Sequence, residues 1–164
     1  GTELGAGGFF PVVTDRTDSG AVRDCRDLSK LGHQLVEASE QCERLDLPVL
    51  AMRPDDDASS AWTLSQLLEH WKESAEGCHL LICRERSGGA GNPLLQVLRE
   101  LDGQEIAFLI GPEGGWSPSE EETMDKWSQE SDMVHCVSLG RLVLRAETAA
   151  MAALCAHMLH HDSK

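Results

Sequence analysis

A glycine-rich stretch, residues 110–120, is the first candidate for chemistry. After an apolar run at residues 105–110, three glycines and a proline fall within residues 111–115. Glycine lets the backbone approach a ligand closely and adopts positive φ angles readily. Ser117, Pro118 and then Glu120 form the pattern of a capping box at the start of a helix. The stretch therefore predicts a ligand-binding loop or, as the alternative, a tight strand-to-helix turn without a ligand.

The charges in and after this stretch restrict the ligand that it could hold. Glu113 lies among the glycines, and Glu120, Glu121 and Glu122 follow. These carboxylates would repel a nucleotide phosphate, because like charges at short range are costly. A cationic sulfonium cofactor would not suffer that repulsion, so the pattern favours a positively charged ligand.

The second candidate is the stretch at residues 139–150, with sequence LGRLVLRAETAA. A strand-like segment leads into a short apolar loop, and Arg145, Glu147 and Thr148 then open an Ala-rich helix. Glu147 suits the helix dipole without any ligand, and Thr148 is also an ordinary helix-start residue. Arg145 lies between apolar segments, where a lone charge is costly unless it is paired. Glu147 is a candidate partner for it.

The elements that must position these two stretches alternate between strand and helix patterns. Strands are expected at residues 8–13 (interrupted by Pro11), 47–51, 79–83, 105–110 and 133–139, helices at 28–45, 62–76, 93–101 (with Pro93 first), 118–130 and 146–161, and loops at 15–27, 53–60 and 87–92. This alternation predicts an α/β fold with a mostly parallel sheet and helices on both faces. Ligands bind such sheets beyond the carboxyl ends of the strands, which here means after Ile110 and after Leu139.

Composition places few restrictions on this picture. The 164 residues suit one domain. No run of 18 apolar residues exists, so no membrane span is expected, and residues 1–13 do not have the features of a signal peptide. The six cysteines form no C-x-x-C pair, which favours buried reduced thiols in a reducing compartment over disulfides or zinc.

Two further sets of side chains are candidate ligand sites. His157, His160 and His161 share one face of the last helix, and a solvated helix end is favoured there over a metal site. Three tryptophans are expected to pack in the core from helices, namely Trp62, Trp71 and Trp127. Trp116 lies in the glycine-rich stretch instead and is a candidate for stacking on a base. No metal is expected.

The net charge of −14 argues against a chain that holds RNA by itself. Phosphate contacts supply much of the affinity for nucleic acids, so such a chain should carry a basic patch. The composition does not show one. An RNA-binding function would therefore need basic surface outside these 164 residues.

Together, the two candidate stretches resemble a known family. FLIGPEGGWSPSEEE and, about thirty residues on, LGRLVLRAETAAMAAL are similar to motifs of the RsmE family of SPOUT-class RNA methyltransferases. EASEQCERLDLPVL resembles that family's Glu-Gln-x-x-Arg helix, and TELGAGGFFPVVTDR resembles its first helix end and second strand. The resemblance covers nearly the whole chain. One departure is Arg141-Leu142, where the family often has Pro-Arg.

The resemblance implies a fold and a function. The fold would be of the SPOUT type with a C-terminal trefoil knot, and the protein would be a homodimer with the site completed across the interface. It would use S-adenosylmethionine to methylate N3 of a uridine in small-subunit ribosomal RNA, with that RNA or the ribosomal subunit as partner. The compartment would be the cytoplasm, or a mitochondrion or plastid in a eukaryote.

The family also carries an N-terminal RNA-binding domain and a first strand ahead of the matched region. We expect residues 1–164 to be the SPOUT domain without those two parts, which would account for the missing basic patch. One rival is a non-catalytic SPOUT-fold module that dimerises or associates with RNA. A second rival, if the resemblance is fortuitous, is an ordinary nucleotide-binding α/β enzyme.

The resemblance also implies roles for individual residues. Arg145 and Glu147 would be catalytic: Arg145 would stabilise negative charge on the uracil, and Glu147 would orient Arg145 or accept the proton. Gln41 and Arg44 would contact RNA or the second subunit. Cofactor binding, mostly through backbone groups, would fall to Leu109, Ile110, Gly111, Glu113, Gly114, Gly115, Leu139, Gly140, Leu142, Leu144, Arg145 and Thr148.

Overall fold

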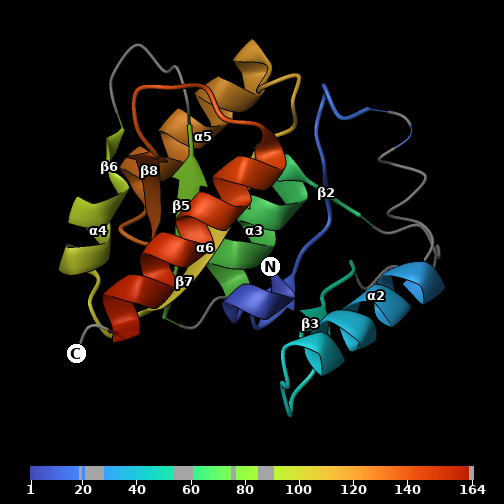
Figure 1. The fold of residues 1–164 in the computed structure, drawn as a ribbon. Helices are drawn as coiled ribbons and strands as arrows, with labels where there is room; N and C mark the ends of the chain where they lie inside the picture. The colour runs from blue at the N-terminus through green and yellow to red at the C-terminus, as the bar shows by residue number, and fades with distance from the viewer. Residues whose placement is uncertain (19, 21–27, 54–60, 75–76, 85–90, 163–164) are drawn as a thin grey trace.

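The computed structural model describes residues 1–18, 20, 28–53, 61–74, 77–84 and 91–162. Within these residues the chain forms a central parallel sheet with helices packed on it and a smaller N-terminal part beside it (Figure 1). Residues 54–60 and 87–90 of two expected loops, and most of residues 19–27, lie outside the described residues; Asn92, expected at the end of the second of these loops, instead forms part of a strand.

The central sheet has four parallel strands in the order β6-β8-β5-β7. They are β5 (Cys78–Cys83), β6 (Asn92–Pro93), β7 (Glu105–Ile110) and β8 (Val134–Ser138). Side chains of β5 alternate between two hydrophobic clusters: Leu80 and Ile82 enter one, whereas Leu81 and Cys83 enter the other. A parallel sheet is buried on both faces, and this alternation shows that both faces of β5 are core. The prediction of a mostly parallel sheet is confirmed.

Helices cover both faces of this sheet, as predicted (Figure 1). On one face, Leu68 of α3 and Met124 of α5 join the cluster that contains Leu80. On the other face, Leu98 of α4 and Ala153 of α6 join the cluster that contains Leu81. The four helices are α3 (Leu64–Ser74), α4 (Leu94–Glu100), α5 (Pro118–Glu130) and α6 (Ala146–Asp162).

The N-terminal part pairs short parallel strands at the point where Pro11 interrupts the expected strand. Before Pro11, β1 pairs with β3, and after it β2 pairs with β4. The helix α2 packs against the 3₁₀ helix η1 and stands beside the main sheet (Figure 1). These elements are η1 (Thr2–Leu4), β1 (Gly8–Phe9), β2 (Val12–Val13), α2 (Leu28–Gln41), β3 (Val49–Leu50) and β4 (Trp62–Thr63).

Three expected boundaries are wrong for identifiable reasons. The helix α2 ends at Gln41 rather than near residue 45, because Glu43 adopts a left-handed φ of 58°. Trp62 packs from β4 rather than from a helix, since the next residue, Thr63, caps α3. Pro93 pairs with β8 in extended backbone, so α4 begins one residue later.

The expected capping box at the start of α5 is confirmed. The side chain of Ser117 accepts a hydrogen bond from the backbone N–H of Glu120 at 3.3 Å. In return, the carboxylate of Glu120 accepts one from the backbone N–H of Ser117 at 2.8 Å. These bonds satisfy donors that the first helical turn would otherwise leave unpaired, and they fix where the glycine-rich loop ends.

The described cysteines are all free thiols, as expected. Of these, only Cys83 is buried. The expectation of burial is wrong for the other four, which are half-buried: Cys42, Cys78, Cys136 and Cys155. Burial raises the pKa of the Cys83 thiol to about 12, so it stays protonated. Cys25 lies outside the described residues. No helix among the described residues is long and apolar enough to cross a membrane.

A histidine pair in the sheet predicts a pH dependence of stability. His79 Nδ1 and His135 Nε2 lie 2.9 Å apart on neighbouring strands. Burial and the neighbouring His79 lower the pKa of His135, against smaller opposite effects of Asp132 and Glu100. The fold therefore favours neutral His135, and this stabilisation is present above the unfolded pKa of about 6.5 and lost as the pH falls below it.

The variant His135→Gln should make the protein less sensitive to acid. We expect the loss in Tm between about pH 7.5 and about pH 5.5 to be smaller in this variant than in the unsubstituted protein, because glutamine takes up no proton in the unfolded chain. Thermal unfolding by circular dichroism measures it, with the exposed His33→Gln on α2 as the matched control. An unchanged Tm difference in His135→Gln would contradict the role of this pair.

Candidate active site

A pocket of about 430 Å³ opens at the carboxyl ends of β5, β7 and β8. Its walls come from the end of β5, from residues 110–116 after β7, and from residues 139–144 after β8 together with the first turns of α6. Gly114 and Gly140 both line it, so the two glycine-bearing loops fold side by side. The pocket therefore lies beyond the carboxyl ends of the parallel strands, which is where ligands bind such sheets.

The loop after β7 is shaped by close contacts that only glycine permits. The backbone N–H of Gly115 donates to the carbonyl of Pro112 at 2.9 Å, and Gly115 has a φ of 67°. A side chain at Gly111 would place its Cβ 2.8 Å from the indole of Trp116. Trp116 is only 9% exposed and belongs to the core cluster. The candidate for base stacking is thus a core residue whose ring packs under the loop and forms part of the pocket wall.

The loop after β8 forms the opposite wall. The side chain of Ser138 accepts a hydrogen bond from the N–H of Gly140, which has a φ of 135°. Leu142 and Val143 line the pocket yet remain 79% and 53% exposed. This wall therefore presents apolar side chains both to the pocket and to the outside.

Most residues to which the sequence assigned cofactor binding line this one pocket. Those that line it are Ile110, Gly111, Glu113, Gly114, Gly115, Leu139, Gly140, Leu142 and Leu144. Leu109 does not line it, since its side chain is buried in the core cluster. Arg145, Glu147 and Thr148 are exposed at the start of α6, outside the set of lining residues.

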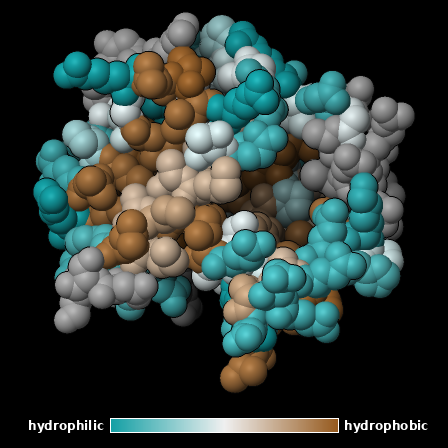
Figure 2. All heavy atoms as spheres, viewed as in Figure 1, coloured by the Kyte–Doolittle hydropathy of each residue, from teal (hydrophilic) through white to brown (hydrophobic). Residues whose placement is uncertain are grey.

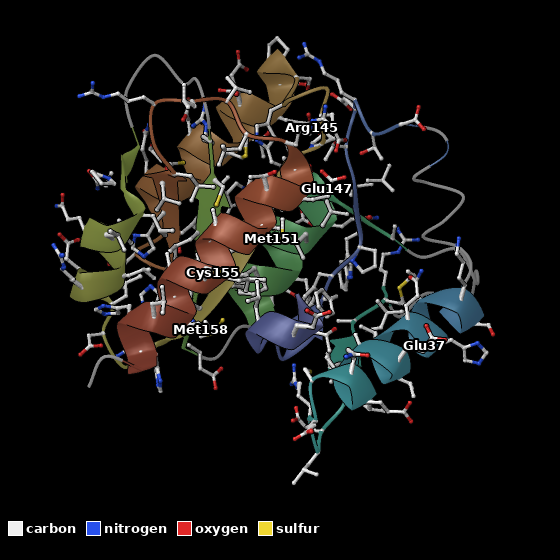
Figure 3. The ribbon with its side chains drawn as sticks, viewed as in Figure 1. Glu37, Arg145, Glu147, Met151, Cys155 and Met158 are labelled. Atoms are coloured by element: carbon white, nitrogen blue, oxygen red, sulfur yellow. The ribbon has the colours of Figure 1, made fainter. Side chains whose placement is uncertain are left out.

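The possible pairing of Arg145 with Glu147 is not observed. Both side chains are exposed at the N-terminal end of α6 (Figure 3), and among the described residues no ion pair joins them. Leu142 and Val143 are exposed, Leu144 is half-buried, and the side chain of Arg145 is itself exposed, so the guanidinium contacts water and needs no partner. Arg145 therefore remains available to a ligand.

Gln41 and Arg44 lie in the N-terminal part and do not line the pocket. Gln41 is exposed at the end of α2. One nitrogen of Arg44 donates to the carbonyls of Thr2 and Ala6, each at 2.9 Å, and the guanidinium also forms an ion pair with Asp46. The side chain of Arg44 is 16% exposed, so it ties α2 to η1 within the chain.

Arg84 at the end of β5 was missed in the sequence. Its side chain lines the pocket, is 3% exposed and forms ion pairs with Glu121 and Asp125 of α5. Burial lowers the pKa of Arg84, but hydrogen bonds to Asp125, Cys136 and Glu121 outweigh burial and raise the pKa above its ordinary value. Arg84 thus carries a permanent charge, and its ion pairs join the end of β5 to α5. In the sequence, a single arginine directly after an apolar run was the only feature that could have indicated this role.

A second missed feature is a strap, residues 14–17, that crosses from β2 to the glycine-rich loop. Arg16 Nη1 donates to the carbonyl of Gly114 at 3.1 Å, and Arg16 lines the pocket. The carboxylate of Asp15 accepts from Ser117 Oγ at 2.6 Å, and the N–H of Asp15 donates to Glu120 at 3.0 Å. The sequence shows the strap only as part of a polar loop.

Residues 1–158 match the RNA methyltransferase domain family. The chain belongs to this family. Family membership confirms the resemblance found in the sequence, and it agrees with a pocket built from the two loops that carried that resemblance.

Members of the family with curated names are similar over most of the chain. Ribosomal RNA small subunit methyltransferase E of Rickettsia conorii is 27% identical over 153 residues, covering 93% of this chain and 54% of that protein. The protein of the same name from Synechocystis is 32% identical over 157 residues, covering 93% of this chain and 45% of that protein. The chain thus spans about half the length of these relatives.

A solved structure confirms the fold. The crystal structure of ribosomal RNA small subunit methyltransferase E from Neisseria gonorrhoeae bound to S-adenosylmethionine superposes with a TM-score of 0.71 at 24% identity. The superposition covers 97% of this chain and 58% of the Neisseria gonorrhoeae chain. The α/β architecture of this family member is therefore that of a known RNA methyltransferase structure.

Proposed function

We propose that the protein transfers a methyl group from S-adenosylmethionine to N3 of a uridine in small-subunit ribosomal RNA. The observation that carries the proposal is the meeting of two glycine-bearing loops, residues 110–116 and 139–144, on one pocket. Support comes from the family and from relatives named ribosomal RNA small subunit methyltransferase E. In this proposal residues 1–164 constitute the SPOUT methyltransferase domain.

The pocket fits such a cofactor in size and charge. Its volume of about 430 Å³ falls in the range of small-molecule sites. Glu113 and Glu121 line it, and the charge of Arg84 is balanced by Glu121 and Asp125. With the exposed Arg16, the lining holds two basic and two acidic side chains, so it carries no net positive charge that would repel a cationic cofactor. The cofactor would supply a methyl group on a cationic sulfur, and backbone groups of the two loops would hold it.

The side chains at the start of α6 would act on the uracil. N3 of uridine is a weak acid and must lose its proton for the nitrogen to attack a methyl group. The guanidinium of Arg145, which forms no ion pair within the described residues, would stabilise negative charge on the ring, and Glu147 would accept the proton. The methyl group would pass from the sulfonium sulfur directly to N3, and S-adenosylhomocysteine would leave.

The proposal includes a homodimer and a C-terminal trefoil knot, both drawn from the family resemblance, and we place the dimer interface on α6. Met151 and Leu159 are 52% and 61% exposed on α6, and Figure 2 shows hydrophobic residues running along this helix. Glu147, Met151, Cys155 and Met158 share one side of α6 (Figure 3). A second subunit on this side would bring Glu147 to the interface, which favours a site completed by both subunits.

Binding of S-adenosylhomocysteine and methylation of small ribosomal subunits test the proposal. Calorimetry on the protein at its full natural length should give a micromolar Kd, and subunits lacking the modification should gain one methyl group at a uridine. Binding without methylation would favour the non-catalytic module. Absence of binding would refute the methyltransferase assignment and favour an ordinary nucleotide-binding enzyme.

A further inference from the structure

The strap presents one exposed guanidinium at the pocket. Arg16 is exposed and lines the pocket wall. Within the described part of the chain its side chain makes a single hydrogen bond, from Nη1 to the carbonyl of Gly114. A guanidinium has five N–H donors, so most of its donors are left for a ligand.

The backbone that carries Arg16 is fixed to the cofactor loop and to α5. Asp15 is bonded to both Ser117 and Glu120 of the capping box. On the other side of the strap, the N–H of Thr17 donates to the carbonyl of Thr14 at 3.2 Å. Arg16 and Gly114 are so close that a Cβ at Gly114 would lie 2.9 Å from the Cβ of Arg16. The guanidinium therefore starts from a preorganised position.

The charged side chains of the pocket separate into a buried, ion-paired guanidinium and exposed groups, which include Arg16 and Glu113. Arg84, the other lining cation, is buried and paired with Glu121 and Asp125, whereas Arg16 is exposed and pairs with no described carboxylate. Arg141 and Arg145, on the loop that forms the opposite wall, are exposed as well. This grouping stands out in a chain with 14 basic and 28 acidic residues.

We propose that Arg16 binds a phosphate of the RNA strand beside the target uridine, at the edge of the pocket. The proposal rests on the proposed function. The guanidinium of Arg84 is buried and already paired with carboxylates, whereas a phosphate can reach the exposed guanidinium of Arg16, whose planar donors match phosphate oxygens. Because Arg16 also donates a hydrogen bond to the carbonyl of Gly114, it would align the RNA strand with the loop that would hold the cofactor.

Arg16→Gln in the full-length protein tests this assignment against the matched control Arg99→Gln. Arg99 is an exposed arginine on α4 outside the pocket. We expect Arg16→Gln to raise the KM for small subunits about 10-fold, as for loss of one charge-assisted contact. The slope of log K for RNA against log salt should fall by about one. The Kd for S-adenosylhomocysteine should stay within about twofold, and Arg99→Gln should change none of these.

Arg16→Lys separates charge from geometry. Lysine keeps the positive charge, so Arg16→Lys should keep the salt dependence of the unsubstituted protein. Its KM for small subunits should lie between that of the unsubstituted protein and that of Arg16→Gln, because lysine lacks the planar donors of arginine. An unchanged KM and salt slope in Arg16→Gln would overturn the proposal, as would weaker S-adenosylhomocysteine binding with normal RNA affinity, because Arg16 would then be a cofactor residue. If the unsubstituted protein neither binds S-adenosylhomocysteine nor methylates, the proposed function fails, and the salt slope alone then decides for or against a phosphate contact.

Discussion

Arg145→Ala is expected to lower kcat for methylation of small subunits about 100- to 1000-fold, the loss typical for removal of a group that stabilises developing charge. The side chain of Arg145 is exposed and has no partner among the described residues, so its removal should leave folding intact. It also lies outside the residues that line the pocket, so cofactor affinity should change by less than about twofold.

Single-turnover kinetics with tritiated S-adenosylmethionine would measure the effect, because chemistry is then separated from product release. Arg99→Ala, which removes an exposed arginine far from the pocket lining, is the control. Methylation within about threefold of the unsubstituted rate, with normal Tm, would remove Arg145 from the mechanism.

Local signals in the sequence predicted the elements that bear the site closely. The bounds of β7 and α5 agree with the expected residues 105–110 and 118–130. Each has a strong local cause: β7 is a short apolar run between polar residues, and α5 begins with a capping box and a proline. Because both carboxyl-end loops could be located in this way, the position of the pocket could be predicted from the sequence.

Contacts between distant residues could not be predicted from these signals. Arg16 and Gly114 are separated by 98 positions, and the partners of Arg84 by 37 and 41. A polar loop and a single arginine give no indication of such partners, since the contacts depend on how the sheet brings chain segments together. The strap and the Arg84 cluster therefore emerge only from the three-dimensional arrangement.

The error over Arg145 and Glu147 has a different origin. Apolar neighbours in the sequence suggest a buried charge at Arg145, but Leu142 and Val143 are exposed. Exposed apolar residues are common on protein surfaces, so an apolar sequence context alone does not establish burial. The same exposure agrees with a surface that a second subunit or RNA would cover.

Gly111→Ala should show how tightly the cofactor loop is held. The new Cβ would lie 2.8 Å from Trp116 Cε2, and two more indole atoms lie at 3.0 Å. Trp116 is packed in the core and has little room to move, so the loop must shift. We expect a loss of about 1–3 kcal/mol in the free energy of unfolding and an S-adenosylhomocysteine affinity at least about 10-fold weaker.

The same substitution at Gly32 gives the control with the opposite sign. A Cβ at Gly32 would meet nothing within 4 Å, and the residue lies within α2. Gly32→Ala should therefore raise the free energy of unfolding by about 0.5–1 kcal/mol without changing ligand affinity. Urea unfolding and calorimetry on both variants measure the contrast. If Gly111→Ala bound S-adenosylhomocysteine as tightly as Gly32→Ala, the backbone of this loop would not be what holds the ligand.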